Sequence, residues 1–265
     1  MTNPLVIYFS GTGNTKYIAE LFATKTAGTC HSIEEKIDFE MELASHKTIA
    51  FCYPIYGSRA PYIMRRFASR HSDALKDKDV IIFVNQMIFS GDGARVFCDL
   101  FPKKHFKVIY ADHFFMPNNV GNLFFLPKQS QKTIKKFFLR AEKKMLRVCK
   151  NIENGKIKKR GFSAASRFLG NIQGFLWQGR SKNVFPAKFS MERRAMSRVK
   201  IFSNCSRCGL CIKKCPMDNL LLTNGSVAQR GSCTVCYRCI NLCPKKAVAI
   251  FFSGRPRWQY KSDVK

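Results

Sequence analysis

The chain has 265 residues, 46% of them hydrophobic, and a formal net charge of +29 from 46 Lys and Arg against 17 Asp and Glu. No apolar stretch approaches the roughly 18 residues that span a bilayer, so we expect a soluble or peripheral protein. The apolar run of residues 4–9 is too short for a secretory signal. We therefore expect a cytoplasmic protein whose twelve cysteines are reduced.

The first 150 residues alternate short apolar runs with helical patterns, which is typical of a parallel sheet with helices on both faces. The predicted strands are residues 5–9, 29–33, 48–53, 80–85 and 107–111. Helices are predicted at 15–26 and 134–149, where apolar residues recur at helical spacing. The sequence thus predicts a five-stranded, doubly wound α/β domain.

Three loops of this domain carry residues suited to a ligand. In a doubly wound sheet, ligands bind outside the carboxyl ends of strands where strand order reverses, here after strands one, three and four. Residues 10–15 (SGTGNT) combine hydroxyls, glycines and a helix N-terminus, which favours a phosphate group. They complete neither a P-loop nor a dinucleotide fingerprint.

The other two loops are residues 54–58 (PIYGS) and 85–93 (NQMIFSGDG). Tyr56 is placed to cover a planar ring, Gly57 leaves the backbone free to reorient, and the second loop adds an apolar wall. Each loop alone is equally consistent with a plain tight turn, and a tyrosine such as Tyr56 is by itself more often an ordinary core residue. The combination favours a binding site.

The junction that follows is strongly basic. Residues 128–200 contain 21 Lys and Arg against three Glu, a net charge of +18. A basic amphipathic helix is predicted there from apolar residues at helical spacing, which are Ala165, Phe168, Leu169, Ile172, Phe175 and Leu176. We expect this stripe to pack against one of the domains. Contact with an anionic membrane, an acidic protein or nucleic acid remains as an alternative.

Eight of the cysteines form two copies of the pattern C-x2-C-x2-C-x3-C-P, placed 28 residues apart. This spacing is typical of 4Fe-4S clusters, and the fourth cysteine of each copy ligates the other cluster in bacterial two-cluster proteins. By that rule one cluster has the ligands Cys205, Cys208, Cys211 and Cys243. The other has the ligands Cys233, Cys236, Cys239 and Cys215. Structural zinc and disulfides are the disfavoured alternatives.

The remaining cysteines and the histidines lack any ligand spacing. Small core positions are predicted for Cys30, Cys52, Cys98 and Cys149. Surface or loop positions are predicted for His31, His46, His71, His105 and His113.

Three motifs together resemble flavodoxin/ferredoxin fusion proteins, in which an FMN-binding flavodoxin-like domain precedes a bacterial two-cluster ferredoxin domain. These motifs are YFSGTGNT (8–15), YPIYG (53–57) and the doubled cysteine pattern. The resemblance implies that the FMN phosphate is held by Ser10, Thr12, Gly13, Asn14 and Thr15. It implies that the flavin ring is framed by Pro54, Ile55, Tyr56 and Gly57, together with Asn85, Gln86, Met87, Ile88, Phe89, Ser90 and Gly91.

The expected organisation follows from these motifs. A flavodoxin-like domain with a five-stranded parallel sheet occupies residues 1–152, and a basic amphipathic linker occupies 153–198. A small α+β ferredoxin-type domain with two 4Fe-4S clusters occupies 199–254, and a basic tail occupies 255–265.

We expect an electron-transfer protein that relays electrons between FMN and the two 4Fe-4S clusters, to or from a redox partner protein with an acidic surface. No nicotinamide-binding fingerprint and no candidate nucleophile is present, which favours a carrier over a self-contained enzyme. The alternative is a flavin-dependent reductase of a small molecule with the ferredoxin domain as electron inlet. An iron-sulfur nucleic-acid-binding protein is less favoured, because no nucleic-acid module is recognisable.

Overall fold

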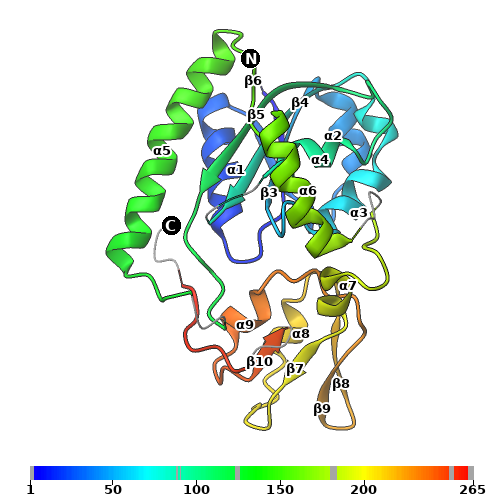
Figure 1. Cartoon of the computed structure of the whole chain (residues 1–265), viewed down its shortest axis with the longest axis vertical. Helices are drawn as coiled ribbons and strands as arrows, with labels where there is room; N and C mark the ends of the chain where they lie inside the picture. The colour runs from blue at the N-terminus through cyan, green and yellow to red at the C-terminus, as the bar shows by residue number, and fades with distance from the viewer. Residues whose placement is uncertain are drawn as a thin grey trace.

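The computed structural model describes residues 3–87, 89, 91–122, 126–179, 184–250 and 254–261. Two predicted flavin-loop residues, Ile88 and Ser90, lie outside the described residues, as do residues 262–265 of the predicted tail. An N-terminal α/β domain carries a smaller C-terminal unit at one end of its sheet (Figure 1). In the part of the chain that the structure describes, no helix is long and apolar enough to cross a membrane.

The sheet of the N-terminal domain has six parallel strands rather than the five predicted. Its order is β2-β1-β3-β4-β5-β6. The strands are β1 (Leu5–Tyr8), β2 (Thr29–Ser32), β3 (Thr48–Pro54), β4 (Asp79–Gln86), β5 (Lys107–Phe115) and β6 (Lys158–Lys159). The sixth strand lies in the predicted linker and pairs Lys158 with Tyr110. Its two lysines carry no apolar pattern, which is why the sequence did not reveal it.

Helices cover both faces of this sheet, as predicted (Figure 1). Side chains of a strand alternate between the faces, so Val6 packs with one helical layer while Leu5 and Ile7 pack with the other. The first layer contains α1 (Asn14–Thr26) and α5 (Gln131–Glu153). The second contains α2 (Phe39–Ser45), α3 (Tyr62–Arg70), the short helix η1 (Asp73–Leu75) and α4 (Gly93–Cys98).

A buried charge cluster fastens β5 to its neighbours. Asp112 is fully buried, and its carboxylate accepts hydrogen bonds from Lys144 of α5 at 2.8 Å and Lys158 of β6 at 2.7 Å. Burial favours protonation, but the two ammonium groups outweigh it and lower the pKa of Asp112. The adjacent His113 is also buried, which corrects its predicted surface position.

The helix of the basic junction, α6 (Ala164–Gln178), lies with its apolar stripe outward. Phe168, for example, is 67% exposed, so the expectation that the stripe packs against a domain is wrong. The helix instead turns its small residues inward. A Cβ placed on Gly170 would lie 1.9 Å from the Asp92 carboxylate, and one on Gly174 would lie 2.0 Å from the Arg59 guanidinium. Only glycine permits this close approach.

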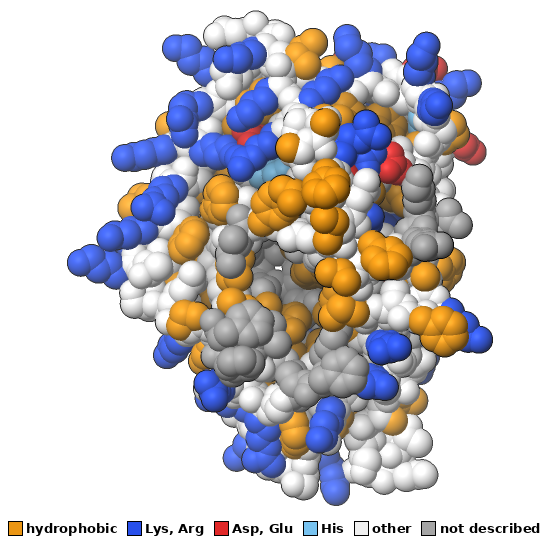
Figure 2. All heavy atoms as spheres, viewed as in Figure 1, with side chains coloured by type: hydrophobic (Ala, Val, Ile, Leu, Met, Phe, Trp, Pro, Cys, Tyr) orange, Lys and Arg blue, Asp and Glu red, His pale blue; other side chains and the backbone are white. Residues whose placement is uncertain are grey.

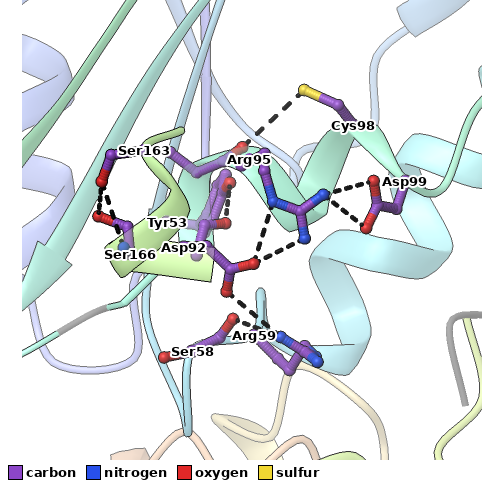
Figure 3. Close-up of polar contacts among 11 residues, drawn as sticks. Tyr53, Ser58, Arg59, Asp92, Arg95, Cys98, Asp99, Ser163 and Ser166 are labelled. Carbon is purple, nitrogen blue, oxygen red and sulfur yellow. Dashed lines mark hydrogen bonds and ion pairs between the residues drawn. The ribbon is translucent and has the colours of Figure 1, made fainter. Parts of the chain in front are cut away.

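The polar network beneath α6 explains that inverted arrangement (Figure 3). Asp92 is fully buried and pairs with Arg95 at 2.6 Å and with Arg59 at 3.6 Å. Arg95 also pairs with Asp99 at 2.9 Å. A layer of charged groups offers no apolar surface to bury the phenylalanines and leucines of α6, so the stripe faces away from it.

The C-terminal unit consists of two antiparallel strand pairs with short helices between them. Its elements are α7 (Met191–Met196), β7 (Val199–Ile201), α8 (Leu210–Lys213), β8 (Leu220–Thr223), β9 (Ser226–Gln229), α9 (Arg238–Leu242) and β10 (Val248–Ile250). Strand β7 pairs with β10, and β8 pairs with β9. A small apolar core that includes Ile240, Val248 and Ile250 holds the unit together.

The described part of the predicted tail, residues 255–261, folds back across both parts of the molecule. The backbone N–H of Tyr260 donates to the Asn241 side chain of α9 at 2.6 Å, while its ring is buried in the core shared by α1 and α5. Trp258 donates from its indole N–H to the Leu126 carbonyl at 3.2 Å. The segment therefore joins the C-terminal unit to the N-terminal domain.

Candidate functional site

The loop after β1 is shaped to receive an anion. Gly13 has φ 98°, a left-handed conformation that glycine adopts freely, and its N–H donates to the hydroxyl of Ser10 at 3.0 Å. No side chain caps the N-terminus of α1, which begins at Asn14. Its first N–H groups are therefore available to a phosphate, and the helix dipole favours the negative charge.

Residues distant in sequence fix the side chains of this loop. The amide of Asn119 donates to the Thr12 hydroxyl at 2.9 Å, and the Tyr260 hydroxyl donates to the Asn14 side-chain oxygen at 2.6 Å. Asn14 in turn donates to the Pro117 carbonyl at 2.9 Å. Sequence reasoning did not identify Asn119 or Tyr260, because neither belongs to a local pattern.

The loop after β3 turns tightly beneath α6. Tyr56 and Arg59 exchange two backbone hydrogen bonds of 3.0 Å across Gly57 and Ser58, which both have positive φ. This is the geometry of a two-residue hairpin turn. The Trp177 side chain of α6 covers Gly57, where an added Cβ would lie 2.3 Å from it.

Tyr56 also faces the C-terminal unit. Burial raises the pKa of its phenol well above the usual value, and the neighbouring Cys236, Tyr237 and Cys233 raise it further. The ring meets the Trp177 indole edge-on at 6.5 Å between centroids. The predicted flavin-covering residue is thus placed between α6 and the second copy of the cysteine pattern.

The loop after β4 completes the carboxyl edge of the sheet. Asn85 is buried and donates to the Thr15 hydroxyl at 3.1 Å, while its carbonyl accepts from the Ile55 N–H at 2.9 Å. Its side-chain oxygen is buried without a hydrogen-bond partner among the described residues. A buried oxygen of this kind favours a bound donor group.

The remaining predicted residues of these two loops line the same edge. Pro54 is the last residue of β3, Gln86 is the buried last residue of β4, and Met87 is half-buried beyond it. Phe89 is 42% exposed, and Gly91 has φ 50°. Figure 2 shows a hollow in the surface between the N-terminal domain and the C-terminal unit. The uncapped helix and the Asn85 oxygen fit the predicted FMN.

The doubled cysteine pattern is matched by a doubled backbone conformation. Left-handed φ values occur at Arg207, Gly209 and Asp218 in the first copy. They recur 28 residues later, in the second copy, at Val235, Tyr237 and Lys246. Such conformations are uncommon for residues other than glycine, so their recurrence shows that the repeat in sequence is also a repeat in structure.

The two copies interlock around two small cavities. One cavity is lined by four cysteines that belong to both copies, Cys205, Cys208, Cys211 and Cys243. The other is lined by the complementary four, Cys215, Cys233, Cys236 and Cys239. The structure therefore brings together the same two sets of four that the sequence predicts as cluster ligands.

Backbone N–H groups point at four of these sulfurs. The sulfurs of Cys205 and Cys215 accept from N–H groups at 3.4 Å and 3.3 Å, and the equivalent Cys233 and Cys243 accept at 3.3 Å and 3.2 Å. Hydrogen bonds to sulfur are one means by which proteins tune iron-sulfur clusters. In the described ranges no group of three or more His, Cys, Asp or Glu side chains is placed to hold a single metal ion.

The two cysteine sets differ in exposure. Cys233 and Cys236 are buried, and burial raises the pKa of the Cys236 thiol to about 11. Cys208 in the first set is exposed. The predicted core cysteines Cys52 and Cys149 are buried as free thiols.

The second cysteine loop packs directly on the loop after β1. A Cβ placed on Gly11 would lie 2.2 Å from the Cys236 carbonyl oxygen. Arg238 donates to the backbone carbonyls of Ser10 at 2.8 Å and Gly11 at 3.2 Å, and pairs with Glu34 at 2.6 Å. Arg238 lies next to Cys239 in the sequence, and its bridging role is a property of the fold.

A groove of about 1450 Å³ lies elsewhere, beside α4 and α6. None of the predicted cofactor-binding residues lines it. We therefore place the candidate site at the carboxyl edge of the sheet and not in this groove.

The chain was compared with known proteins. Solved structures similar to it include a WrbA-like flavodoxin from Agrobacterium tumefaciens (19% identity, 59% of this chain and 100% of that chain, TM-score 0.39). A two-electron reduced flavodoxin from Megasphaera elsdenii matches at 21% identity over 52% of this chain and 98% of that chain, with a TM-score of 0.35. General stress protein 14 from Treponema denticola, in complex with FMN, matches at 12% identity over 57% and 99%, with a TM-score of 0.39.

No curated protein matches the chain. The family model of the flavodoxin domain matches residues 5–169, which contain the six-stranded sheet and the three loops at its carboxyl edge. This match extends past β6 into α6. The chain belongs to the flavodoxin domain family.

Proposed function

We propose that this protein transfers electrons between an FMN in its flavodoxin domain and two 4Fe-4S clusters in its C-terminal unit, to or from a redox partner protein. When bound, FMN converts between two-electron and one-electron steps, and the clusters carry single electrons. Membership of the flavodoxin family supports a flavin-binding redox role for the N-terminal domain. The two cysteine sets of the C-terminal unit extend this role to a relay between the flavin and the clusters.

The residues that would hold FMN lie in the three loops described above. The uncapped N-terminus of α1 and the Ser10 to Gly13 turn would bind the phosphate. The buried side-chain oxygen of Asn85 would accept a hydrogen bond from the flavin. Tyr56 and Trp177 would exclude water from one side of the ring.

One observation supports clusters over zinc in the C-terminal unit. Each cavity is lined by four cysteines, three from one copy of the pattern and the fourth from the other copy. That exchange of the fourth cysteine is typical of two-cluster iron-sulfur proteins.

One observation carries the proposal: the second cysteine set lies against the loop that would bind FMN phosphate. The Cys236 carbonyl contacts Gly11, and Arg238 joins the two loops by hydrogen bonds to Ser10 and Gly11. The N–H of Ile63 on α3 also donates to the Thr234 hydroxyl at 3.2 Å. This direct packing of the two loops favours electron exchange between the proposed redox centres within the molecule.

The first cysteine set suits exchange with a partner. Its Cys208 is exposed, and exposed cations lie within three residues of its cysteines in the sequence. These are Arg207, Lys213, Lys214, Lys245 and Lys246. We propose a partner with an acidic surface, because complementary charge accelerates the encounter of two proteins.

The test is the cofactor content of the anaerobically purified protein. About eight irons, an equal amount of sulfide and one FMN per chain are expected. Cys236→Ser should lower the iron content to about four, because one cluster loses a ligand. Cys149→Ser, which alters a buried free thiol outside the pattern, should leave it unchanged.

Zinc without sulfide would contradict the relay. Iron without flavin would leave the C-terminal unit intact and contradict the flavin half of the proposal. Turnover of an organic acceptor by the reduced protein, without any protein partner, would favour the alternative of a small-molecule reductase.

A further inference from the structure

We propose that the outward face of α6 binds to the surface of an anionic lipid bilayer. This face consists of Phe168, Leu169, Ile172, Phe175 and Leu176, which are between 45% and 67% exposed. Figure 2 shows hydrophobic side chains gathered over α6, with Lys and Arg side chains nearby. Contiguous apolar surface of this kind marks a contact with a protein or a membrane.

The helix cannot bury this face by rolling over. Its inner side carries Gly170 and Gly174, which sit against Asp92 and Arg59 at distances where no larger side chain fits. Ser58 also donates to the Gln173 side chain at 2.6 Å. Because contacts on the inner side fix the rotation of α6, the apolar face is a permanent feature of the surface.

Hydrophobic side chains and cations meet again beyond both ends of the helix. Arg160 lies over the ring of Phe115 at 5.8 Å, and Phe115 is 43% exposed. Lys188 lies over the ring of Phe189 at 5.6 Å, and Phe189 is 77% exposed. An aromatic ring beside a cation suits the bilayer interface, where the ring enters the acyl boundary and the charge stays with the headgroups.

The positive charge around α6 favours an anionic bilayer over a protein partner. Residues 154–191 contain eight Lys and Arg and no Asp or Glu. The groove of about 1450 Å³ beside α6 adds six exposed cations against three Asp, and these are Lys47, Lys103, Lys104, Lys107, Lys159 and Arg167. Anionic headgroups attract such a surface, and each cation close to the bilayer adds to the binding. The interfaces of protein partners, in contrast, are depleted of Lys in their centre.

The test is flotation of the full-length holoprotein with lipid vesicles. Binding is expected to vesicles of phosphatidylcholine with phosphatidylglycerol, to weaken at high salt, and to be absent with phosphatidylcholine alone. The double variant Phe168→Gln with Phe175→Gln should bind at least about tenfold more weakly, because two rings no longer enter the bilayer.

A matched control comes from α5. Leu139 and Leu146 are 46% and 54% exposed and, like Phe168 and Phe175, lie seven residues apart on one face of a basic helix. The double variant Leu139→Gln with Leu146→Gln should bind within about twofold of the unchanged protein, because α5 does not contribute the contact. Circular dichroism and the unfolding midpoint establish that both variants are folded.

Three outcomes would overturn the inference. One is that the unchanged protein does not float with anionic vesicles at low salt. Another is equal weakening in both double variants, which would assign binding to the overall charge. The third is a dimer in light scattering that Phe168→Gln with Phe175→Gln dissociates, which would show that a second copy covers α6. All three leave the iron and flavin contents, and so the proposed function, unaffected.

Discussion

Arg238 donates a hydrogen bond from Nη2 to the backbone carbonyl of Ser10 at 2.8 Å, and thereby joins α9 to the loop after β1. The same guanidinium pairs with Glu34 at 2.6 Å, and its side chain is largely shielded from solvent. A hydrogen bond from a charged donor to a carbonyl is stronger than one from a neutral donor. This charge-assisted contact connects the C-terminal unit to the loop that we propose binds the FMN phosphate.

Replacing Arg238 should loosen that connection. Arg238→Gln should lower the free energy of unfolding by about 1–3 kcal/mol, because hydrogen bonds to a charged group are lost and two carbonyls lose their donor. Urea denaturation measures the change, and hydrogen exchange of residues 10–13 and 233–243 should show faster opening. Glu34→Gln keeps the contacts with Ser10 and Gly11 and should cost less than about 1 kcal/mol. Equal losses in both variants would contradict the role given to the carbonyl contacts.

A methyl group at Gly11 should separate the two units. The added Cβ would lie 2.2 Å from the Cys236 carbonyl, so the cysteine loop must shift, at a cost of about 1–3 kcal/mol. Gly11→Ala should therefore slow electron exchange between flavin and clusters in stopped-flow spectroscopy while iron and flavin contents are retained. Gly254→Ala is the control, since no atom of the described residues lies within 4 Å of a Cβ at that position. Unchanged kinetics in Gly11→Ala would argue against direct exchange across this contact.

Alanine at the inner face of α6 should destabilise the protein, although Gly to Ala inside a helix ordinarily stabilises. Gly170→Ala and Gly174→Ala would each drive a methyl group into the Asp92 and Arg59 pair, at about 1–3 kcal/mol by urea denaturation. Asn171→Ala, at an exposed position of the same helix, should change stability by less than about 0.5 kcal/mol. Stabilisation by either glycine variant would show that α6 does not sit tightly on this network.

Buried His113 should make the protein sensitive to acid. Burial, with help from the charge of Arg160, lowers the pKa of His113 from 6.5 to about 3. The imidazole is neutral in the folded state, and unfolding lets it bind a proton below its ordinary pKa. The contribution of neutral His113 to the free energy of unfolding is therefore complete above pH 6.5, and it is lost as the pH falls towards 3.

Urea denaturation at several pH values measures this effect. Between pH 7 and 4 the loss from His113 amounts to about 3 kcal/mol by linkage. The imidazole is faced by Asp112, Lys144 and Arg160. These groups contribute to the pH dependence of stability in the unchanged chain and in His113→Gln alike. His113→Gln should therefore show a shallower decline of stability with acidification than the unchanged chain. Parallel declines would mean that His113 is accessible to protons in the folded state.

The sequence by itself determined the features that depend on local spacing. Apolar runs such as residues 48–53 identified five of the six strands, and apolar residues at helical spacing identified α1 and α5, because both periods can be read from neighbouring residues. The cysteine spacing likewise predicted which of the eight sulfurs would share a cavity. These patterns need no knowledge of distant contacts.

Only the tertiary structure decided how these pieces face one another. The stripe of α6 has helical spacing in either orientation, and it turns outward because Asp92 and Arg59 lie beneath Gly170 and Gly174. The contacts of Tyr260 with Asn14 and of Arg238 with Ser10 join positions more than 220 residues apart. Contacts between residues that are distant in the sequence produce no periodic pattern in it. The junction between the two units could therefore be identified only from the tertiary structure.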